Sequence, residues 1–319
     1  EQAGNKDKAI DAAGNNNTAS NQLTRTSDTV APNAPVIGHI AGDEKINISE
    51  KTAIIVTGTA EANSLVTVTL TNGANSKSGT EQLTGEATSF SITIDGTTAA
   101  PSALADGTIT PSVTATDAAG NVSASDTSPT ALQDTVAPAF TVNNGTDSGP
   151  VKTDTINLSV ADANLSTSKY GFSANNICNS LDTITTDFTS AVDFTVVADH
   201  NDYLCVKATD TVGNETYQLV GQLNTDNTDP DLTINSMFTG QTLTGGNTYP
   251  ISWTASDLHL GATPIKLEYS IDGGSNWTTI AAATANDGTE NWTVPSVNSS
   301  NCLIQVTAAD EAGNFDADP

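Results

Sequence analysis

The sequence predicts an all-β chain built from tandem β-sandwiches, and three observations support this. Runs of alternating apolar and polar residues recur along the chain, as in half-buried strands. Thr, Ser, Asn, Asp and Gly dominate between these runs, which suits short strands joined by turns. The third observation is a repeated phrase, in which Val113–Asn121 returns as Val206–Asn214 and Val306–Asn314, with a shorter copy at Asp11–Asn15. Its aspartates are 106, 93 and 100 positions apart, near the size of one sandwich domain.

Each copy of this phrase predicts a strand followed by a sharp turn. In the first full copy, Val113 and Ala115 face inward and the threonines beside them face outward. The alternation stops at Asp-x-x-Gly-Asn, where Gly and Asn accept the positive φ angle of a tight turn. We expect a return strand after the turn, and any functional chemistry at the turn itself.

The composition excludes several classes of partner. The chain has 319 residues and a net charge of −27, from 10 Lys+Arg, including the single arginine Arg25, against 37 Asp+Glu. Phosphate contacts need basic side chains, so neither nucleic acid nor an anionic membrane surface is expected as a partner. No run approaches the length of a membrane span, so membrane insertion is not predicted. The alternating runs argue against disorder in spite of the acidity.

A second phrase marks the linkers between domains. Asp28–Pro32 reads Asp-Thr-Val-Ala-Pro, and it returns as Asp134–Pro138 and, more loosely, as Asp226–Pro230. From turn Asp to linker Asp the spacing is 17, 17 and 16 positions, so turn, last strand and linker keep one geometry. Proline ends strand pairing there and stiffens the junction. The expected divisions are an orphan segment at 1–27, then repeats at 28–133, 134–225 and 226–319.

The clearest strands follow from alternation and β-propensity. The first repeat predicts them at 53–58, 65–70, 89–94 and 109–116; the second at 156–160, 192–197, 203–209 and 217–220; the third at 249–253, 265–271, 277–280 and 302–308. No amphipathic helical pattern occurs.

Gly58-Thr-Ala-Glu61 before a strand, the Asp-x-x-Gly-Asn turns and the Asp-Thr-x-Ala-Pro linkers resemble those of bacterial immunoglobulin-like repeats. The resemblance covers nearly the whole chain. Such repeats build the stalks of large surface adhesins and related extracellular filaments, so the resemblance implies immunoglobulin-like β-sandwiches arranged end to end. The third repeat departs most from the pattern and is nearer a fibronectin-type variant.

Carboxylates at the turns and linkers are candidate calcium ligands. Stacked sandwiches would bring each linker near turns of the adjoining domains, and crowded carboxylates repel unless a hard cation lies among them. The resemblance also implies calcium at junctions. The alternative is that Asp and Asn are turn formers bonded to their own backbone. The candidates are Asp28, Asp117, Asn121, Asp134, Asp210, Asn214, Asp226, Asp229, Asp310 and Asn314.

A binding surface in the third repeat is the rival site. Trp253, Trp277 and Trp292 could form an aromatic face for a glycan or a receptor, although sandwiches routinely bury a Trp in the core. Ser270–Trp277 also matches the Asp-box of sialidase propellers, but a propeller needs several copies. We expect a hairpin there.

Catalysis is not predicted. His39, His200 and His259 lie in three different repeats, without a nearby nucleophile or metal-ligand spacing, so neither a catalytic triad nor a zinc site is expected.

Strand parity predicts one disulfide. Val206 aligns with the inward Val of the repeat, so Cys205 points outward and can reach the loop of Cys178, 27 residues earlier. Cys302 is four positions before Val306, so it is expected to face inward as a buried thiol. A disulfide within one domain indicates a location outside the cytoplasm.

These features favour a non-enzymatic structural protein, extracellular or at the cell surface, within an adhesin stalk or filament. Its partners would be further repeats of the same chain or a second copy, head to tail. The third repeat ends soon after its turn, whereas 16–26 is a strand-length segment without a domain before it. Donation of that strand to the next subunit would form a filament, although a cut through a longer array would leave the same ends.

Overall fold

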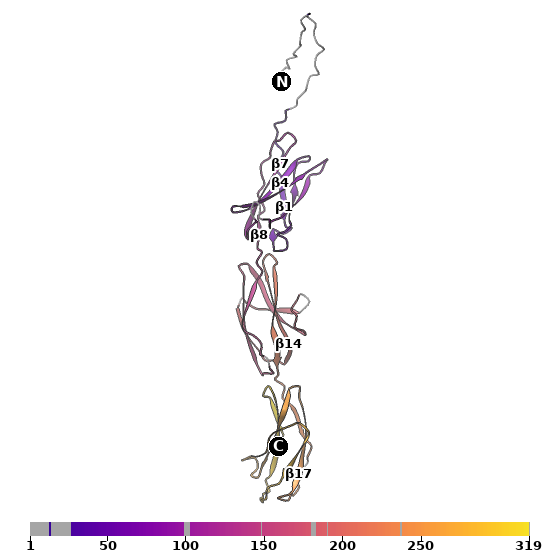
Figure 1. Ribbon diagram of the computed structural model, residues 1–319, viewed down its shortest axis with the longest axis vertical. Coiled ribbons are helices and arrows are strands. Elements are labelled where there is room, and N and C mark those ends of the chain that lie inside the picture. Colours follow the sequence, from indigo (N-terminus) through magenta and orange to yellow (C-terminus); the bar gives the residue numbers. More distant parts are fainter. Residues whose placement is uncertain are drawn as a thin grey trace. The chain divides into compact units, whose positions relative to one another are not determined.

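The computed structural model describes residue 13 and residues 27–318, except 99–102, 148, 180–182, 190 and 237. The described part contains strands and no helix, as the sequence predicts. The chain divides into two compact units, Glu1–Thr135 and Val136–Pro319. The first unit contains one β-sandwich and the second contains two (Figure 1). The segment 16–26, predicted as a donor strand, lies outside the described residues, as does Asp11.

The first sandwich pairs a three-stranded sheet with a five-stranded one. The first sheet has the order β1 (Val36–Ile40), β3 (Ile54–Thr59), β6 (Ser89–Ile94). The second has the order β2 (Lys45–Ile46), β8 (Ala131–Gln133), β7 (Gly107–Thr116), β4 (Leu65–Asn72), β5 (Asn75–Gln82). Only the β2–β8 pair is parallel among these.

The second sandwich pairs three strands with four. One sheet has the order β13 (Ala191–Val196), β10 (Asp154–Ala161), β9 (Ala139–Asn144). The other has the order β12 (Ile184–Asp187), β11 (Leu165–Ser173), β14 (His200–Asp210), β15 (Glu215–Thr225).

The third sandwich has the same arrangement. One sheet has the order β16 (Asp231–Ile234), β17 (Thr248–Ser256), β20 (Thr289–Thr293). The other has the order β19 (Thr278–Thr284), β18 (Leu260–Ser270), β21 (Leu303–Asp310), β22 (Phe315–Asp318). The return strand β22 is short and pairs with residues 306–309 of β21.

All three sandwiches therefore share one topology. In chain order, the first, second and fifth main strands form one sheet, and the third, fourth, sixth and seventh form the other; the first sandwich adds the short β2. This is an immunoglobulin-like sandwich with seven main strands. In every copy the Asp-x-x-Gly-Asn turn follows the sixth main strand and precedes the seventh.

Each core lies between its two sheets, as period-two alternation requires. In β6 the side chains alternate exposed and buried along Ser89–Ile94. The first core joins Val56 and Ile92 of one sheet to Val68 and Val113 of the other. The second core likewise includes residues of β10 and β14, and the third includes residues of β17 and β21.

The strands predicted within the three repeats are all present, but several others were missed. The missed strands include β5, β11 and β12, whose sequences are too polar for an alternation signal. β5 lies at a sheet edge, where polar side chains are tolerated because one side of the strand faces water.

The cysteine predictions were correct about the pair and wrong about the third thiol. Cys178 and Cys205 form a disulfide, with Cα atoms 5.6 Å apart. Leu204, Cys205 and Val206 are all fully buried. Leu204 and Val206 pack in the second core cluster, whereas Cys205 lies outside that cluster and is bonded to Cys178. Cys302 is exposed, not buried. It precedes β21, so strand parity does not extend to it.

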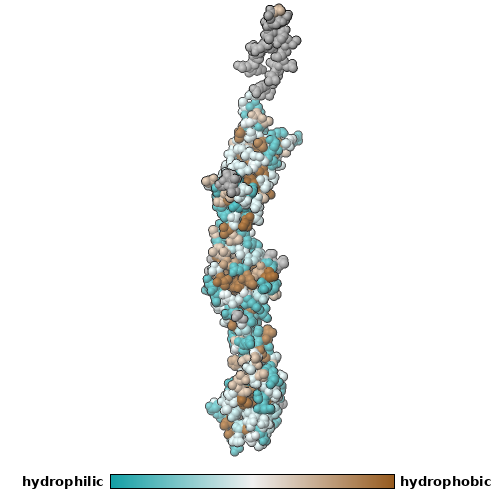
Figure 2. All heavy atoms as spheres, viewed as in Figure 1, coloured by the Kyte–Doolittle hydropathy of each residue, from teal (hydrophilic) through white to brown (hydrophobic). Residues whose placement is uncertain are grey.

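The surface is predominantly polar. On the face shown in Figure 2, hydrophobic residues occur in small groups, the largest over the second sandwich. Scattered apolar residues of this kind are normal for a folded domain. Among the residues described, no helix has the length and apolar character to span a membrane.

Candidate functional site

The three Asp-x-x-Gly-Asn turns have one hydrogen-bond geometry. In each turn the Asn amide donates to one carboxylate oxygen of the Asp, and the Asn side-chain amide donates to the other. The glycines have φ angles of 92°, 93° and 87° at Gly120, Gly213 and Gly313. A side chain at such a φ angle is strained, so glycine is required there.

Both carboxylate oxygens are thus engaged within the turn, as expected if Asp and Asn act as turn formers. The hydrogen bond from the Asn121 side chain holds the pKa of Asp117 below its usual value, because it stabilises the ionised form. In the second sandwich Asp210 also accepts the amide of Val212, at 2.9 Å. Asp210 and Asn214 are both buried.

The Asn side chain also bonds to the linker that precedes its own sandwich. Asn121 Nδ2 donates to the carbonyl oxygens of Asp28 and Val30, at 3.3 Å each. Asn314 Nδ2 donates to the carbonyl oxygen of Asp226 at 2.9 Å. One amide therefore serves both the turn and the linker. We call this arrangement the turn–linker clamp.

The linker between β15 and β16 is bonded on both sides. The amide of Asp226 donates to the carbonyl of Val151 in the second sandwich, at 3.0 Å. Asn227 donates its amide to Asp199 Oδ1 at 2.6 Å and its side chain to the carbonyl of Lys152 at 2.7 Å. The hydroxyl of Thr228 also donates to Asp199, and this bond is the main cause that lowers the Asp199 pKa. The linker is thus an ordered connection.

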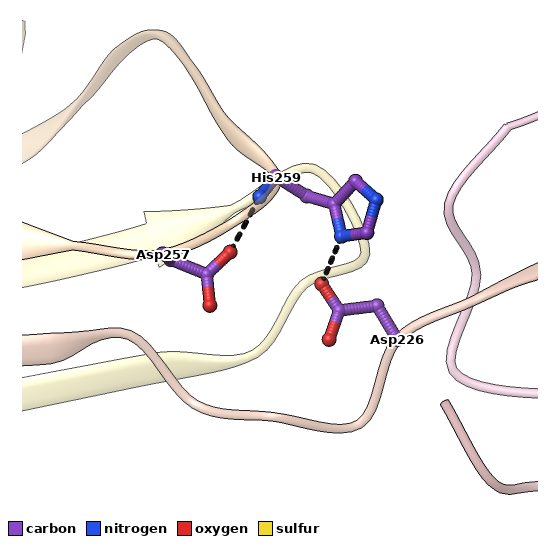
Figure 3. Close-up of side chains that lie close together, drawn as sticks. All are labelled: Asp226, Asp257 and His259. Atoms are coloured by element: carbon purple, nitrogen blue, oxygen red, sulfur yellow. Dashed lines mark hydrogen bonds and ion pairs between the residues drawn. The ribbon is translucent and has the colours of Figure 1, made fainter. Parts of the chain in front are cut away.

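The carboxylate of Asp226 meets a loop of the third sandwich (Figure 3). His259 Nδ1 lies 2.6 Å from Asp226 Oδ2, and the amide of His259 donates to Asp257 Oδ1, also at 2.6 Å. One carboxylate oxygen from each Asp and a His259 ring nitrogen lie within 4.8 Å of one another. The Asp226 side chain is 6% exposed and the His259 side chain 17%.

A similar loop in the second sandwich carries only oxygen ligands. The amide of Asn164 donates to Asp162 Oδ1 at 2.7 Å, as His259 does to Asp257. The carbonyl of Asn164 accepts the amide of Thr211, as His259 accepts that of Glu311. Asn164 and His259 therefore hold equivalent positions. One carboxylate oxygen of Asp162 lies within 4.8 Å of one from Asp210.

Calcium fits the second of these loops better than the first. It takes roughly 6–8 oxygen ligands. Asp162, Asp210 and Asn164 can supply carboxylate and amide oxygens, whereas the atom facing Asp226 is an imidazole nitrogen. The residues around Asp226 therefore fit calcium less well than those around Asp162.

Three further predicted ligands are Asp28, Asp134 and Asp229. Asp28 is exposed and accepts the amide of Val30. Asp134 is buried in the first unit, where its amide donates to the carbonyl of Ile46. Asp229 is exposed and lines the pocket near His259.

Sequence reasoning missed Asp162, Asp257 and His259. The signal was present, because Asp-Ala-Asn at 162–164 and Asp-Leu-His at 257–259 precede equivalent strands. The sequence around His259 shows no metal-ligand spacing, because its partner Asp226 is 33 residues away, in the linker.

The tryptophans do not form an open aromatic face. Trp253 is 2% exposed and Trp292 is 6% exposed, and both belong to the third core. Trp277 is half-buried. Trp253 and Trp292 are thus corrected from candidate ligand contacts to core residues.

The expected hairpin at the Asp-box motif is present. Asn276 donates its amide and its side chain to the two oxygens of Asp272, at 2.8 and 2.6 Å. These bonds, the side-chain bond first, lower the pKa of Asp272 to about 2. The motif therefore has the same Asp–Asn turn bonds as the repeated turns, without a linker contact.

No protein-family model and no curated protein matches the chain. Among solved structures, the chain is similar to a tetra-tandem repeat in the extending region of a large adhesion protein, at 20% identity and a TM-score of 0.31, over 98% of this chain and 78% of that one. It is also similar to fibronectin(III)-like modules of Clostridium thermocellum CbhA, at 16% identity and a TM-score of 0.27, over 56% of this chain and 90% of that one.

A third similar structure contains domains from titin, at 12% identity and a TM-score of 0.34, over 90% of this chain and 96% of that one. Similarity at this level concerns the fold, which the strand order of this chain itself defines.

Proposed function

We propose that the chain is a non-enzymatic structural protein of the cell exterior, a spacer within the stalk or filament of a surface adhesin. The observation that carries this proposal is the turn–linker clamp, which recurs at Asn121 and Asn314. A clamp that ties a sandwich to the linker before it limits bending at that linker, and a spacer needs that property. The disulfide in the second sandwich supports an oxidising compartment.

The joint between the second and third sandwiches has the contacts that a stiff connector needs. The linker spans only residues 226–230, from the end of β15 to the start of β16. Its residues bond to Val151, Lys152 and Asp199 before it, and to His259 and Asn314 after it. A flexible linker would instead be rich in glycine and free of such bonds.

Small-angle scattering of the full chain tests this proposal. An extended particle is expected from this proposal. Its maximum dimension should not shorten when salt is raised, because hydrogen bonds rather than surface charge hold the linker between the second and third sandwiches. Asp226→Ala removes the carboxylate that His259 contacts and should broaden the distance distribution. Asp229→Ala is the matched control, since Asp229 is an exposed aspartate of the same linker. A compact wild-type particle would contradict the proposal.

We also propose that calcium stabilises the second sandwich through Asp162, Asp210 and Asn164. Two carboxylates within 4.8 Å support this, because a cation between them would relieve their repulsion. When bound, calcium would supply charge neutralisation and cross-linking.

Assembly would be with further repeats or with a second copy, head to tail, and the target of such a stalk would be a glycan or a receptor surface. Deletion of 1–27 tests strand donation: sedimentation should show loss of head-to-tail oligomers.

A further inference from the structure

The pocket at the joint between the second and third sandwiches concentrates negative charge beside imidazoles. Its volume is about 680 Å³. Besides Asp226, Asp257 and His259 it is lined by Asp199, Asp229, Asp231 and His200, and no lysine or arginine is among its lining residues. Such a pocket attracts cations by its field.

Three ligand atoms converge in this pocket. A carboxylate oxygen of Asp226, one of Asp257 and a ring nitrogen of His259 lie within 4.8 Å of one another. Ligands of one tetrahedral zinc ion, each about 2.0–2.2 Å from the metal, stand about 3.3 Å apart. His259 Nδ1 and Asp226 Oδ2 are 2.6 Å apart, which is shorter than this ligand–ligand distance because the two atoms share a hydrogen bond. A bound metal ion would replace that hydrogen bond and separate the two atoms slightly. The change required is a side-chain adjustment of less than about 1 Å for this pair.

Contacts outside the ligand atoms already orient these side chains. Asp226 Oδ1 accepts the amide of Thr228 at 3.0 Å, and Asp257 Oδ1 accepts the amide of His259. The amide of Glu311 donates to the carbonyl of His259 at 3.0 Å and anchors the loop to the turn of the third sandwich. Asp226 thus uses one oxygen for orientation and directs the other toward His259. Outer contacts of this kind are typical of metal sites.

We propose that Asp226, Asp257 and His259 bind a divalent transition metal ion of the zinc class. Imidazole nitrogen with two carboxylates is a ligand set for zinc, with water in the fourth position. The ion would cross-link the linker to a loop of the third sandwich. The choice of metal depends on the residue at this loop position. His259 offers a nitrogen ligand in the third sandwich, whereas Asn164 offers an oxygen ligand at the equivalent position of the second. The site goes beyond the proposed stalk role and does not depend on it.

Titration of the full chain with zinc chloride tests the site. The background should carry Cys302→Ser, because the exposed thiol would itself bind zinc. Calorimetry should show one equivalent of zinc bound per chain. His259→Asn and Asp257→Asn should each lower the affinity for this zinc ion by more than roughly tenfold. His39→Asn is the matched control, since His39 also lies 2.9 Å from a carboxylate, that of Glu44. It should leave this equivalent unchanged.

Cobalt(II) absorption supplies a second readout. A tetrahedral band is expected in the wild-type background, and millimolar calcium should not remove it. Circular dichroism checks that each variant is folded. If His259→Asn does not fold, Asp257→Asn still tests the site, because it keeps the His259–Asp226 pair. Equal zinc affinity in Asp257→Asn and the background, loss of the equivalent in His39→Asn, or displacement of cobalt by calcium at comparable affinity would each overturn the proposal.

Discussion

The side-chain amide of Asn314 donates a hydrogen bond to the main-chain carbonyl of Asp226, 88 residues earlier, at 2.9 Å. The same amide binds the carboxylate of Asp310 at 2.7 Å. A single side chain therefore joins a turn at one end of the third sandwich to the linker that enters it. Asn121 makes the corresponding contacts in the first sandwich. The repeated phrase in the sequence is thus a joint element as well as a turn.

Asn314→Ala should destabilise the third sandwich by about 1–3 kcal/mol, the cost of leaving buried partners unsatisfied. Asn314 is 3% exposed, so water cannot fully replace the lost bonds. Urea unfolding followed by tryptophan fluorescence measures this, because all three tryptophans lie in the third repeat. Asn276→Ala is the control, since it removes the same bonds to an Asp without a linker contact. Equal losses in the two variants would mean that the clamp adds nothing.

Acid titration of Asp272 should have its midpoint near pH 2, because bonds from Asn276 hold its pKa at about 2, below the ordinary 3.8. The folded-state pKa is lowered, so the stabilisation is present above pH 3.8 and is lost as the pH falls through about 2. Carbon-13 NMR of the carboxyl group measures the midpoint. In Asn276→Ala the midpoint should rise toward 3.8. An unchanged midpoint in that variant would contradict the assigned cause.

Reduction of the Cys178–Cys205 bond should destabilise the second sandwich by about 3–4 kcal/mol in the chain-entropy model. Far-UV circular dichroism during thermal unfolding follows the effect. Tryptophan fluorescence should be unaffected, because it reports the third sandwich alone. Without reductant, a thiol reagent should modify only Cys302, which is exposed. Modification of Cys205 in the untreated native protein would show that the bond is absent.

Calcium should raise the melting temperature of the second sandwich by binding its native form only. Asp162→Asn should abolish the shift, because it removes one of two neighbouring carboxylates and leaves the Asp210 turn intact. Differential scanning calorimetry with calcium and with chelator measures this. Asp257→Asn is the control, at the equivalent loop position where His259 replaces Asn164. A calcium shift that survives in Asp162→Asn would place the ion elsewhere.

The buried strands and the turns were predictable from the sequence because their determinants are local. Alternation in Ser89–Ile94 reports one buried face. The glycine of Asp-x-x-Gly-Asn reports a positive φ angle at Gly120, Gly213 and Gly313. Parity along β14 placed Cys205 on the face opposite Leu204 and Val206, and this predicted its partner Cys178.

The tertiary structure alone decided what the turns contact. Parity failed at Cys302 because alternation has no meaning before a strand begins. Short-range preferences in the sequence determine each turn and each linker. The contact of His259 with Asp226 depends instead on how β15, the linker and the loop after β17 pack together, because the two residues are 33 positions apart. Local backbone preference determines a turn, whereas packing of distant segments determines which atoms converge on a site.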